Sequence, residues 1–300
     1  TDAIVEKTVP LENGVVSMPM NGGTLENSGW ELSFSFAPIR TKNFMWSVSL
    51  NTSQNFNKVT NALESNKNWT QATTGKVNKE GYAISSFWAF EMEGVDPETG
   101  VPVYNLPDVD SPEAQADATV YMKYMGKLNP DFTSGLSMIF RYKNLSLSSS
   151  FYLSLGGKKF LAPMFSSDMY NDTPNEYNNL PKEWVGRWRK PGDVTNIPSL
   201  PFRNCGSIDL PNGKAYLYQM YNYTTDRVVN ASYLRCNSIS LSYNLSSGLI
   251  RKFAQNVGFS FNVTNPFTIV SSDFKGKDPE VASGSQPLAR NYSFSMSLSF

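Results

Sequence analysis

The residue types best suited to ligand binding gather in one short segment, Glu183–Lys190, which reads EWVGRWRK. If this segment is helical, Trp184 and Trp188 share one face, because residues four apart on a helix are neighbours. Aromatic rings stack on sugars, and the Arg187 guanidinium offers forked N–H donors to hydroxyls or carboxylates. Trp88 is a further candidate of the same kind. The alternative is that these tryptophans pack their loops against the rest of the protein or against a partner.

Catalytic chemistry has few sources in this chain. The sequence contains no histidine, which excludes a Ser-His-Asp triad, a Cys-His dyad and any zinc site that needs imidazole. A carboxylate-dependent glycosidase remains as an alternative. However, Asp96–Gly100 and Asp278–Glu280 are more typical of turns, because Asp, Pro and Gly are turn residues. We therefore expect no catalytic residue, no cofactor and no metal site.

The charge balance also limits the partners. The 26 basic residues are matched by 26 acidic ones, so the net charge supplies no long-range attraction to a polyanion. We expect no nucleic-acid partner. No run of residues approaches the roughly 18 apolar positions that a membrane-spanning helix needs.

The strongest pattern along the chain is strict alternation of apolar and polar residues, which is typical of a strand with one apolar face. The last ten residues show it best, with aromatic or aliphatic side chains at even positions and serine or asparagine at odd ones. The same pattern predicts seven strands of one design: Trp30–Arg40, Phe44–Asn55, Phe132–Tyr142, Leu145–Gly156, Tyr233–Leu245, Val257–Pro266 and Asn291–Phe300.

A half-buried sheet in a soluble, secreted, carbohydrate-binding β-sandwich would alternate in the same way. Three features favour a transmembrane β-barrel instead. The polar face consists mostly of Ser, Asn and Thr rather than Lys and Glu. Aromatic residues cluster at strand ends, as in the girdles at membrane interfaces, and the chain stops on an aromatic residue in an alternating strand.

The connections between the predicted strands alternate between short and long. Links near residues 41–43, 143–144 and 246–256 take turns with long ones near 56–131, 157–232 and 267–290. An outer-membrane barrel has short periplasmic turns and long extracellular loops. One additional wall strand at the strand-like segment Ala83–Gly94 would reverse the direction of every later strand, so this segment must add either no wall strand or two. We therefore expect it to form a hairpin in the first long loop, with Val101–Tyr104 as its partner.

Several landmarks resemble SusC/RagA-type TonB-dependent transporters of Bacteroidetes. They are the run YLRCNSISLSYNL at Tyr233–Leu245, NPFTI at Asn265–Ile269, GKDPE at Gly276–Glu280, GVDPETG at Gly94–Gly100, NPDF at Asn129–Phe132 and the terminal Phe300. The resemblance implies an all-β fold: a 22-stranded antiparallel transmembrane barrel, of which this chain would be the C-terminal third, with about seven or eight wall strands and long extracellular loops. Residues 1–300 would then be the C-terminal part of the barrel, with the plug and N-terminal segments absent from this chain.

The resemblance further implies outer-membrane import of oligosaccharides or peptides. The expected partners are a SusD-like surface lipoprotein that caps the barrel, the TonB complex acting through the missing N-terminal part, the remainder of the barrel chain, and outer-membrane lipid. The sequence does not choose between glycan and peptide as cargo.

Two smaller features depend on this interpretation. Tyr292, Phe294 and Phe300 lie in a C-terminal strand that resembles the signal read by the barrel-assembly machinery, or they simply close the barrel. Cys205 and Cys236 would both be extracellular, where a disulfide forms readily; the alternative is two unpaired thiols.

Overall fold

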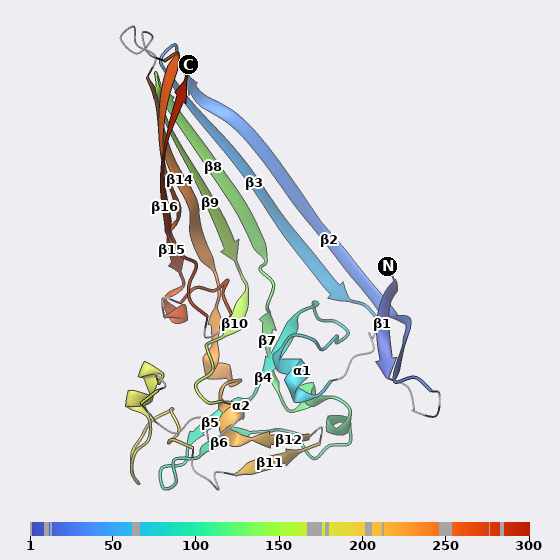
Figure 1. Ribbon diagram of the computed structural model, residues 1–300. Helices are drawn as coiled ribbons and strands as arrows, with labels where there is room; N and C mark the ends of the chain where they lie inside the picture. Colours follow the sequence, from blue (N-terminus) through green and yellow to red (C-terminus); the bar gives the residue numbers. More distant parts are fainter. Residues whose placement is uncertain are drawn as a thin grey trace. The chain divides into compact units, whose positions relative to one another are not determined.

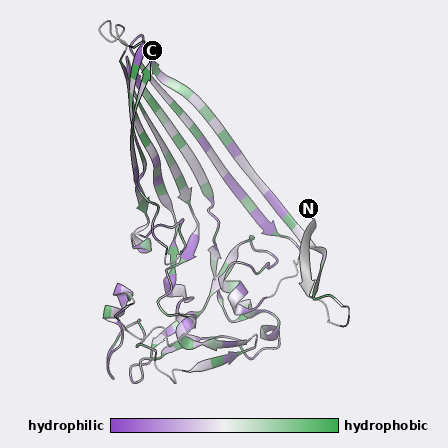
Figure 2. Cartoon of the chain, in the orientation of Figure 1, coloured by the Kyte–Doolittle hydropathy of each residue, from purple (hydrophilic) through white to green (hydrophobic). Residues whose placement is uncertain are grey.

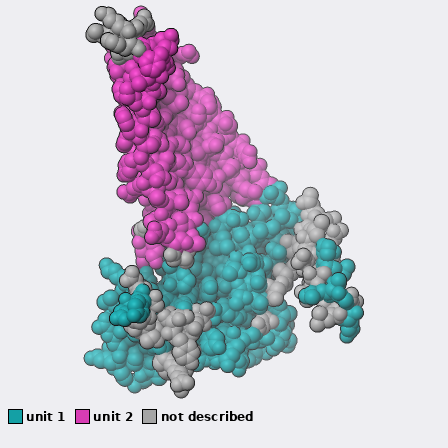
Figure 3. Space-filling view, in the orientation of Figure 1, with its two compact units in different colours: residues 1–27, 57–129, 158–229 teal, residues 28–56, 130–157, 230–300 magenta. Residues whose placement is uncertain are grey.

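The computed structural model describes residues 2–8, 12, 14–61, 67–166, 176–177, 180–201, 206–211, 213–245, 254–275, 277–282 and 285–300. The chain divides into two compact units, each built from three stretches of sequence (Figure 3). Unit 1 contains residues 1–27, 57–129 and 158–229, and unit 2 contains residues 28–56, 130–157 and 230–300. Three-part units of this kind arise when long loops leave and re-enter one sheet.

Unit 2 is built around a sheet of long strands that we call the wall sheet (Figure 1). Its strands, in spatial order, are β2 (Ser17–Arg40), β3 (Phe44–Val59), β8 (Phe132–Tyr142), β9 (Leu145–Leu155), β14 (Tyr233–Leu245), β15 (Asn256–Val270) and β16 (Asn291–Ser299). The first part of β2 belongs to unit 1, where β1 (Asp2–Thr8) pairs with it antiparallel. Spatial order follows chain order throughout, which is an up-and-down meander.

The register places apolar side chains in rows that cross the wall sheet. One row runs through six strands as Trp46, Phe140, Leu147, Leu241, Phe261 and Phe294. Four of its six members are exposed, from 37% at Leu147 to 69% at Phe294, and Trp46 and Phe140 are partly buried. A continuous exposed apolar surface of this kind needs an apolar environment, which lipid provides.

The adjacent rows are polar and carry little charge. One of them crosses the same six strands as Ser49, Ser137, Ser150, Ser238, Thr264 and Asn291. Hydroxyl pairs join neighbouring strands on this face, including Ser35 with Ser49 at 2.9 Å and Ser260 with Ser295 at 2.6 Å. Figure 2 shows hydrophobic and hydrophilic segments alternating along these strands. The period-2 sequence pattern therefore becomes two chemically different faces.

The short connections lie together at one end of the wall sheet. The β2–β3 and β8–β9 turns are joined because the Lys143 amide donates to the Asn43 carbonyl at 2.8 Å. The Asn244 amide donates in turn to the carbonyl of Asn144 at 3.0 Å. Lys143 has a positive φ of 50°, as a two-residue hairpin turn requires. The predicted short link at 246–256 falls largely outside the described residues.

The seven predicted strands are all present, and the all-β fold class is confirmed. Two of them, Phe132–Tyr142 and Tyr233–Leu245, have the predicted bounds. The largest difference is at β2, which begins at Ser17 rather than Trp30. The two-sheet sandwich is wrong, because the long strands form a single sheet and every other sheet in the described chain has two short strands.

Unit 1 contains the long-loop segments, with short strands and helices. Its elements are α1 (Trp69–Thr73), β4 (Ser86–Ala89), β5 (Glu91–Val95), β6 (Pro102–Asn105), η2 (Glu113–Gln115), η3 (Ala118–Val120), β7 (Lys123–Lys127), β10 (Lys158–Phe160), η5 (Lys182–Gly186), β11 (Ser207–Leu210), β12 (Gly213–Tyr216), α2 (Leu217–Tyr221), η6 (Thr225–Arg227) and β13 (Val228–Asn230, whose last residue belongs to unit 2). A 3-10 turn, η8 (Ser272–Phe274), lies in unit 2. Among the described residues, no helix is long and apolar enough to cross a membrane.

The segment Ala83–Gly94 adds no strand to the wall sheet, as parity required, but the expected hairpin is only half right. β5 pairs with β6, which confirms the partner at 101–104. β4 pairs instead with β7, with Ser86 opposite Lys127 and Ala89 opposite Lys123. All four β4 residues are buried, so this strand needs partners on every side and one adjacent hairpin could not supply them.

Two apolar clusters stabilise unit 1. The larger one surrounds Trp69, Trp88 and Phe90, and the smaller one surrounds Phe165 and Trp184. Aromatic rings contact at angles, such as Trp69 with Phe90 at 5.8 Å between centroids. Such clusters give the loop segments a core of their own, which isolated loops lack.

Candidate ligand-binding site

The segment predicted to bind ligand is helical only over Lys182–Gly186. Arg187 has extended backbone angles, with φ of −67° and ψ of 160°, so the helix ends before Trp188. The interpretation that Trp184 and Trp188 share one helix face is therefore wrong.

The two tryptophans pack rather than face solvent together. Trp184 is 4% exposed and stacks on Phe165 with 5.5 Å between ring centroids. The Trp188 indole donates to the Pro97 carbonyl at 3.0 Å. Its ring lies so close to Gly100 that a Cβ there would approach Cε3 to 2.4 Å. Both rings hold the 181–200 loop against neighbouring parts of unit 1, as the packing alternative predicted.

Trp88 is also a core residue. It is 2% exposed and lies between Tyr82 and Tyr124, at 5.4 Å and 5.6 Å between ring centroids. A ring buried to this extent has no face left for a sugar. Of the four predicted binding residues, Arg187 lines an open cavity in the described part of the chain.

That cavity has a volume of about 440 Å³ and lies within the 181–200 loop. We call it the 185–195 cavity after the residues that line it, Val185, Gly186, Arg187, Arg189, Lys190, Asp193, Val194 and Thr195. The Arg187 guanidinium donates to the Trp184 carbonyl at 2.9 Å, and the Arg189 guanidinium donates to the Val185 carbonyl at 2.5 Å. Both guanidinium groups are thus held in place by backbone oxygens of the same loop.

The one carboxylate of the cavity is occupied by backbone amides. Asp193 accepts from the amides of Arg189 and Lys190, at 2.9 Å and 3.2 Å. Thr195 donates to the Gly186 carbonyl at 2.7 Å and so closes the loop. Within the described part of the chain, no carboxylate pairs with the side chains of Arg187, Arg189 or Lys190.

A second cluster of charged residues is fully paired. In unit 2, Arg235 at the start of β14 contacts Asp278 at 2.6 Å through Nη2 and Glu280 at 2.7 Å through Nε. The Tyr233 hydroxyl donates to Glu280 at 2.5 Å. Burial would raise the pKa of the Asp278 carboxyl, but hydrogen bonds from Arg235 and the Glu280 amide outweigh it, so the net shift lowers that pKa. This cluster ties the β15–β16 loop to β14.

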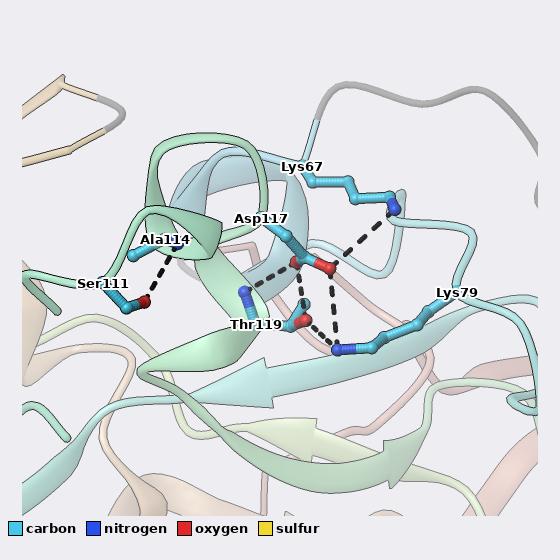
Figure 4. A network of polar contacts seen from close by, with 6 residues as sticks. All are labelled: Lys67, Lys79, Ser111, Ala114, Asp117 and Thr119. Carbon is cyan, nitrogen blue, oxygen red and sulfur yellow. Dashed lines mark hydrogen bonds and ion pairs between the residues drawn. The ribbon is translucent and has the colours of Figure 1, made fainter. Parts of the chain in front are cut away.

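A third polar network lies in unit 1, around Asp117 (Figure 4). The Asp117 carboxylate caps η3 by accepting from the Thr119 amide at 2.9 Å and the Thr119 hydroxyl at 2.6 Å. Lys67 and Lys79 lie 3.8 Å and 3.6 Å from its other oxygen. Burial, with Asp117 as a second cause, raises the pKa of Tyr121 to about 12. The network joins three segments of the first long loop and is structural.

Asp96 accepts from the Glu98 amide at 2.9 Å and the Thr99 hydroxyl at 2.5 Å, and these bonds lower the pKa of its carboxyl. The turn interpretation of this run is confirmed. Cys236 is buried and has a free thiol among the described residues. Its expected partner Cys205 lies outside the described residues, so their pairing stays a prediction.

The C-terminal aromatic residues lie on the edge strand β16 (Tyr292 and Phe294) or directly after it (Phe300). Tyr292, Phe294 and Phe300 are 66%, 69% and 85% exposed. Their availability fits both an assembly signal and closure of a barrel, and their role in assembly stays a prediction.

Sequence reasoning missed the residues that complete both charged clusters. Arg189, Lys190 and Asp193 lie in or just after the tryptophan segment, where an Arg-Lys-Pro run and an Asp three residues later signal a turn. Arg235 could have been found in a different way. It is the single charged residue of an alternating strand, and a buried charge requires a partner of opposite charge.

An antiparallel meander with one lipid-type face, hydroxyl rows on the other face and long loops places the chain in the class of outer-membrane β-barrels. The solved structures agree. The chain matches the RagAB peptide importer in its open-open and closed-closed states with TM-scores of 0.70 and 0.71, at 21% and 22% sequence identity. These matches cover all of this chain and 31% and 32% of the importer chains.

The sequence relatives give the family resemblance. The TonB-dependent receptor SusC of Bacteroides thetaiotaomicron is 28% identical over 99% of this chain, and the TonB-dependent receptor P3 of Formosa agariphila is 26% identical over 93%. The chain spans less than a third of the length of these relatives, 29% and 27% respectively. No protein-family model matches. The resemblance to SusC/RagA-type TonB-dependent transporters is thus confirmed over a partial length of such a protein.

Proposed function

We propose that this chain forms the C-terminal part of the barrel wall, with its long loops, in an outer-membrane TonB-dependent importer of the SusC/RagA type. The observation that carries the proposal is the six-strand apolar row from Trp46 to Phe294, in which Leu147, Leu241, Phe261 and Phe294 are 37% to 69% exposed. In a soluble protein this surface would be a large aggregation hazard.

The open edges of the wall sheet support a larger assembly. β16 lies at one edge, and β1 at the other. Unpaired backbone groups at a sheet edge cannot be satisfied in lipid, so further wall strands must pair with these edges. In the proposed transporter the remainder of the barrel polypeptide supplies them, and the plug and TonB-contacting segments belong to that remainder as well.

The proposed activity is transport without bond chemistry. A cargo, either an oligosaccharide or a peptide, is captured beneath a SusD-like surface lipoprotein, and energy arrives from the TonB complex. The similarity to SusC and to the RagAB peptide importer supports this activity. Localisation in the outer membrane follows from the same proposal.

A combined genetic and biochemical experiment tests the proposal. The gene of the complete protein is deleted, and growth is measured on oligosaccharides, both neutral and uronic-acid, and on tryptic peptides as sole nutrient. We expect loss of growth on one of these classes, recovery by the intact gene, and co-purification of the tagged complete protein with one surface lipoprotein. Unchanged growth and uptake on both classes, or stable monodisperse protein in detergent-free buffer, would refute the proposal.

A further inference from the structure

We infer that the 185–195 cavity is a carboxylate-binding subsite for an anionic cargo, either an acidic peptide or a uronic-acid oligosaccharide. This inference rests on the proposed import function and narrows its substrate class. It depends on three properties of the cavity: unpaired cations, fixed geometry and size.

The first property is the charge of the lining. Arg187, Arg189 and Lys190 surround the space together with a single acid, Asp193, whose carboxylate is taken up by two backbone amides. By contrast, the buried arginines Arg227 and Arg235 have carboxylate partners. Arg227 lies 3.8 Å from Glu183, only a few residues from the cavity in sequence. The cavity therefore has an excess of positive charge that an anion would neutralise.

The second property is the fixed position of the guanidinium groups. Each donates one N–H to a backbone carbonyl, Arg187 to Trp184 and Arg189 to Val185. Those carbonyls belong to the short helix η5, which is held in place by burial of Trp184. The remaining N–H donors of each fork are available. Planar forks held in this way suit the two oxygens of a carboxylate, and little ordering of side chains remains to be done on binding.

The third property is the size and rim of the space. A volume of about 440 Å³ lies within the roughly 300–1,000 Å³ typical of small-ligand sites. Val185 and Val194 line it with side chains that are 68% and 98% exposed. Exposed valines beside cations offer an apolar contact to the carbon skeleton that carries the carboxylate. A sugar residue or a few amino-acid residues fit this description better than a broad protein surface.

The test uses the complete transporter with its lipoprotein, purified in detergent, and calorimetric titration with four ligands. Triglutamate and digalacturonate are the acidic ligands. Acetylated trialanine amide and maltotriose are their neutral counterparts. We expect one acidic ligand to bind more tightly than its neutral counterpart, with weaker binding at high salt. The identity of that ligand distinguishes a peptide carboxylate from a uronic acid.

The double variant Arg187→Gln/Arg189→Gln should weaken binding of the acidic ligand by about tenfold or more, since hydrogen bonds to charged groups are lost. Binding of the neutral ligands should not change. Lys182→Gln is the matched control, because Lys182 is an exposed cation of the same loop that does not line the cavity.

A second variant guards against misfolding of the loop. Val194→Glu places a carboxylate beside the cations at a side chain that is 98% exposed, so it should compete with the acidic ligand while Val194→Gln does not. Unchanged acidic-ligand affinity in both the double variant and Val194→Glu would overturn the inference, as would a loss of lipoprotein affinity without a loss of ligand affinity. If import of neutral cargo persists in that case, the proposed function still stands. If the wild-type complex imports no cargo of any class, the proposed function has failed instead.

Discussion

The wall sheet and the unit 1 loops place the same kind of side chain in opposite surroundings. In the wall sheet, Phe261 and Phe294 are 44% and 69% exposed. In the loops, Phe87 and Phe90 are fully buried. The residue types are the same, so the difference lies in the surroundings: wall aromatics require an apolar solvent, whereas loop aromatics require each other. Apolar content alone therefore says little about where the core lies in such a chain.

The largest expected effect separates these two environments. Trp88→Ala should lower the opening free energy of β4 and β7 by about 3–5 kcal/mol, because it leaves a cavity in a packed core. Hydrogen exchange of the amides in these two strands, in the complete transporter, measures it. Trp30→Ala is the control, since Trp30 in the wall sheet is 44% exposed. Equal effects of both variants on β4 and β7 would contradict the comparison.

A charge-based variant tests whether the paired cluster of unit 2 differs from the unpaired 185–195 cavity. Arg235→Gln should cost about 3–5 kcal/mol in chemical denaturation, because it leaves Asp278 buried without its cation. Asp278→Asn added to that variant should recover part of the loss. Arg187→Gln in the cavity should change stability by less than Arg235→Gln, since Arg187 has no carboxylate partner among the described residues. A larger loss from Arg187→Gln would reverse the assignment of the two clusters.

The same cluster has a pH dependence of defined sign. The folded-state pKa of Asp278 lies below its ordinary value of 3.8. Its contribution to stability is therefore complete above that ordinary value and is lost as pH falls through the lowered pKa. We expect proteolysis of the β15–β16 loop to begin below about pH 4, measured with an acid-active protease. Asp278→Asn should remove this dependence, and persistence of the same dependence in that variant would assign it to another group.

The two faces of the wall sheet can be compared directly at neighbouring positions. Leu241→Arg should destabilise the barrel by about 2–4 kcal/mol if it lies near the bilayer midplane, and Ser242→Arg should cost less, because it points to the polar face. Folding in lipid vesicles with denaturant titration gives both values. Equal costs would mean that the two faces meet the same solvent.

The smallest expected effect concerns the polar network of unit 1. Asp117→Ala should cost about 1 kcal/mol through loss of the η3 cap, with little from the partly exposed lysines. Hydrogen exchange at Thr119 and Val120 reports it. Asp110→Ala, an exposed acid of the same loop, is the control and should have no effect on these amides.

The sequence predicts the wall sheet well because period-2 alternation is a local signal. β8 and β14 have the expected bounds. Successive side chains of a strand point to opposite faces, so the extent of the alternation in the sequence marks the extent of the strand. The first part of β2 was missed because Met18-Pro19-Met20-Asn21-Gly22-Gly23 does not alternate and contains a proline and two glycines, which are weak strand formers.

The candidate site was harder to predict because it depends on contacts that are distant in sequence. Trp188 points to Pro97 and Gly100, about ninety residues earlier, and Trp88 is buried by Tyr82 and Tyr124. The residue type alone does not show whether a tryptophan is exposed or buried. Arg187 was predicted from the chemistry of its guanidinium. The role of Asp193 depends on hydrogen bonds that close the loop, and apolar–polar periodicity carries no information about such bonds.

The hydroxyl rows of the wall sheet have a consequence for how such proteins diversify. β9, β15 and β16 contain no charged residue. These wall strands therefore offer no charged contact that could distinguish one ligand from another. In the proposed transporter, discrimination between cargoes then falls to the loops. Uncharged rows that keep the strand pattern while their residues vary are compatible with a fold shared at TM-scores of 0.70–0.71 by chains 21–22% identical.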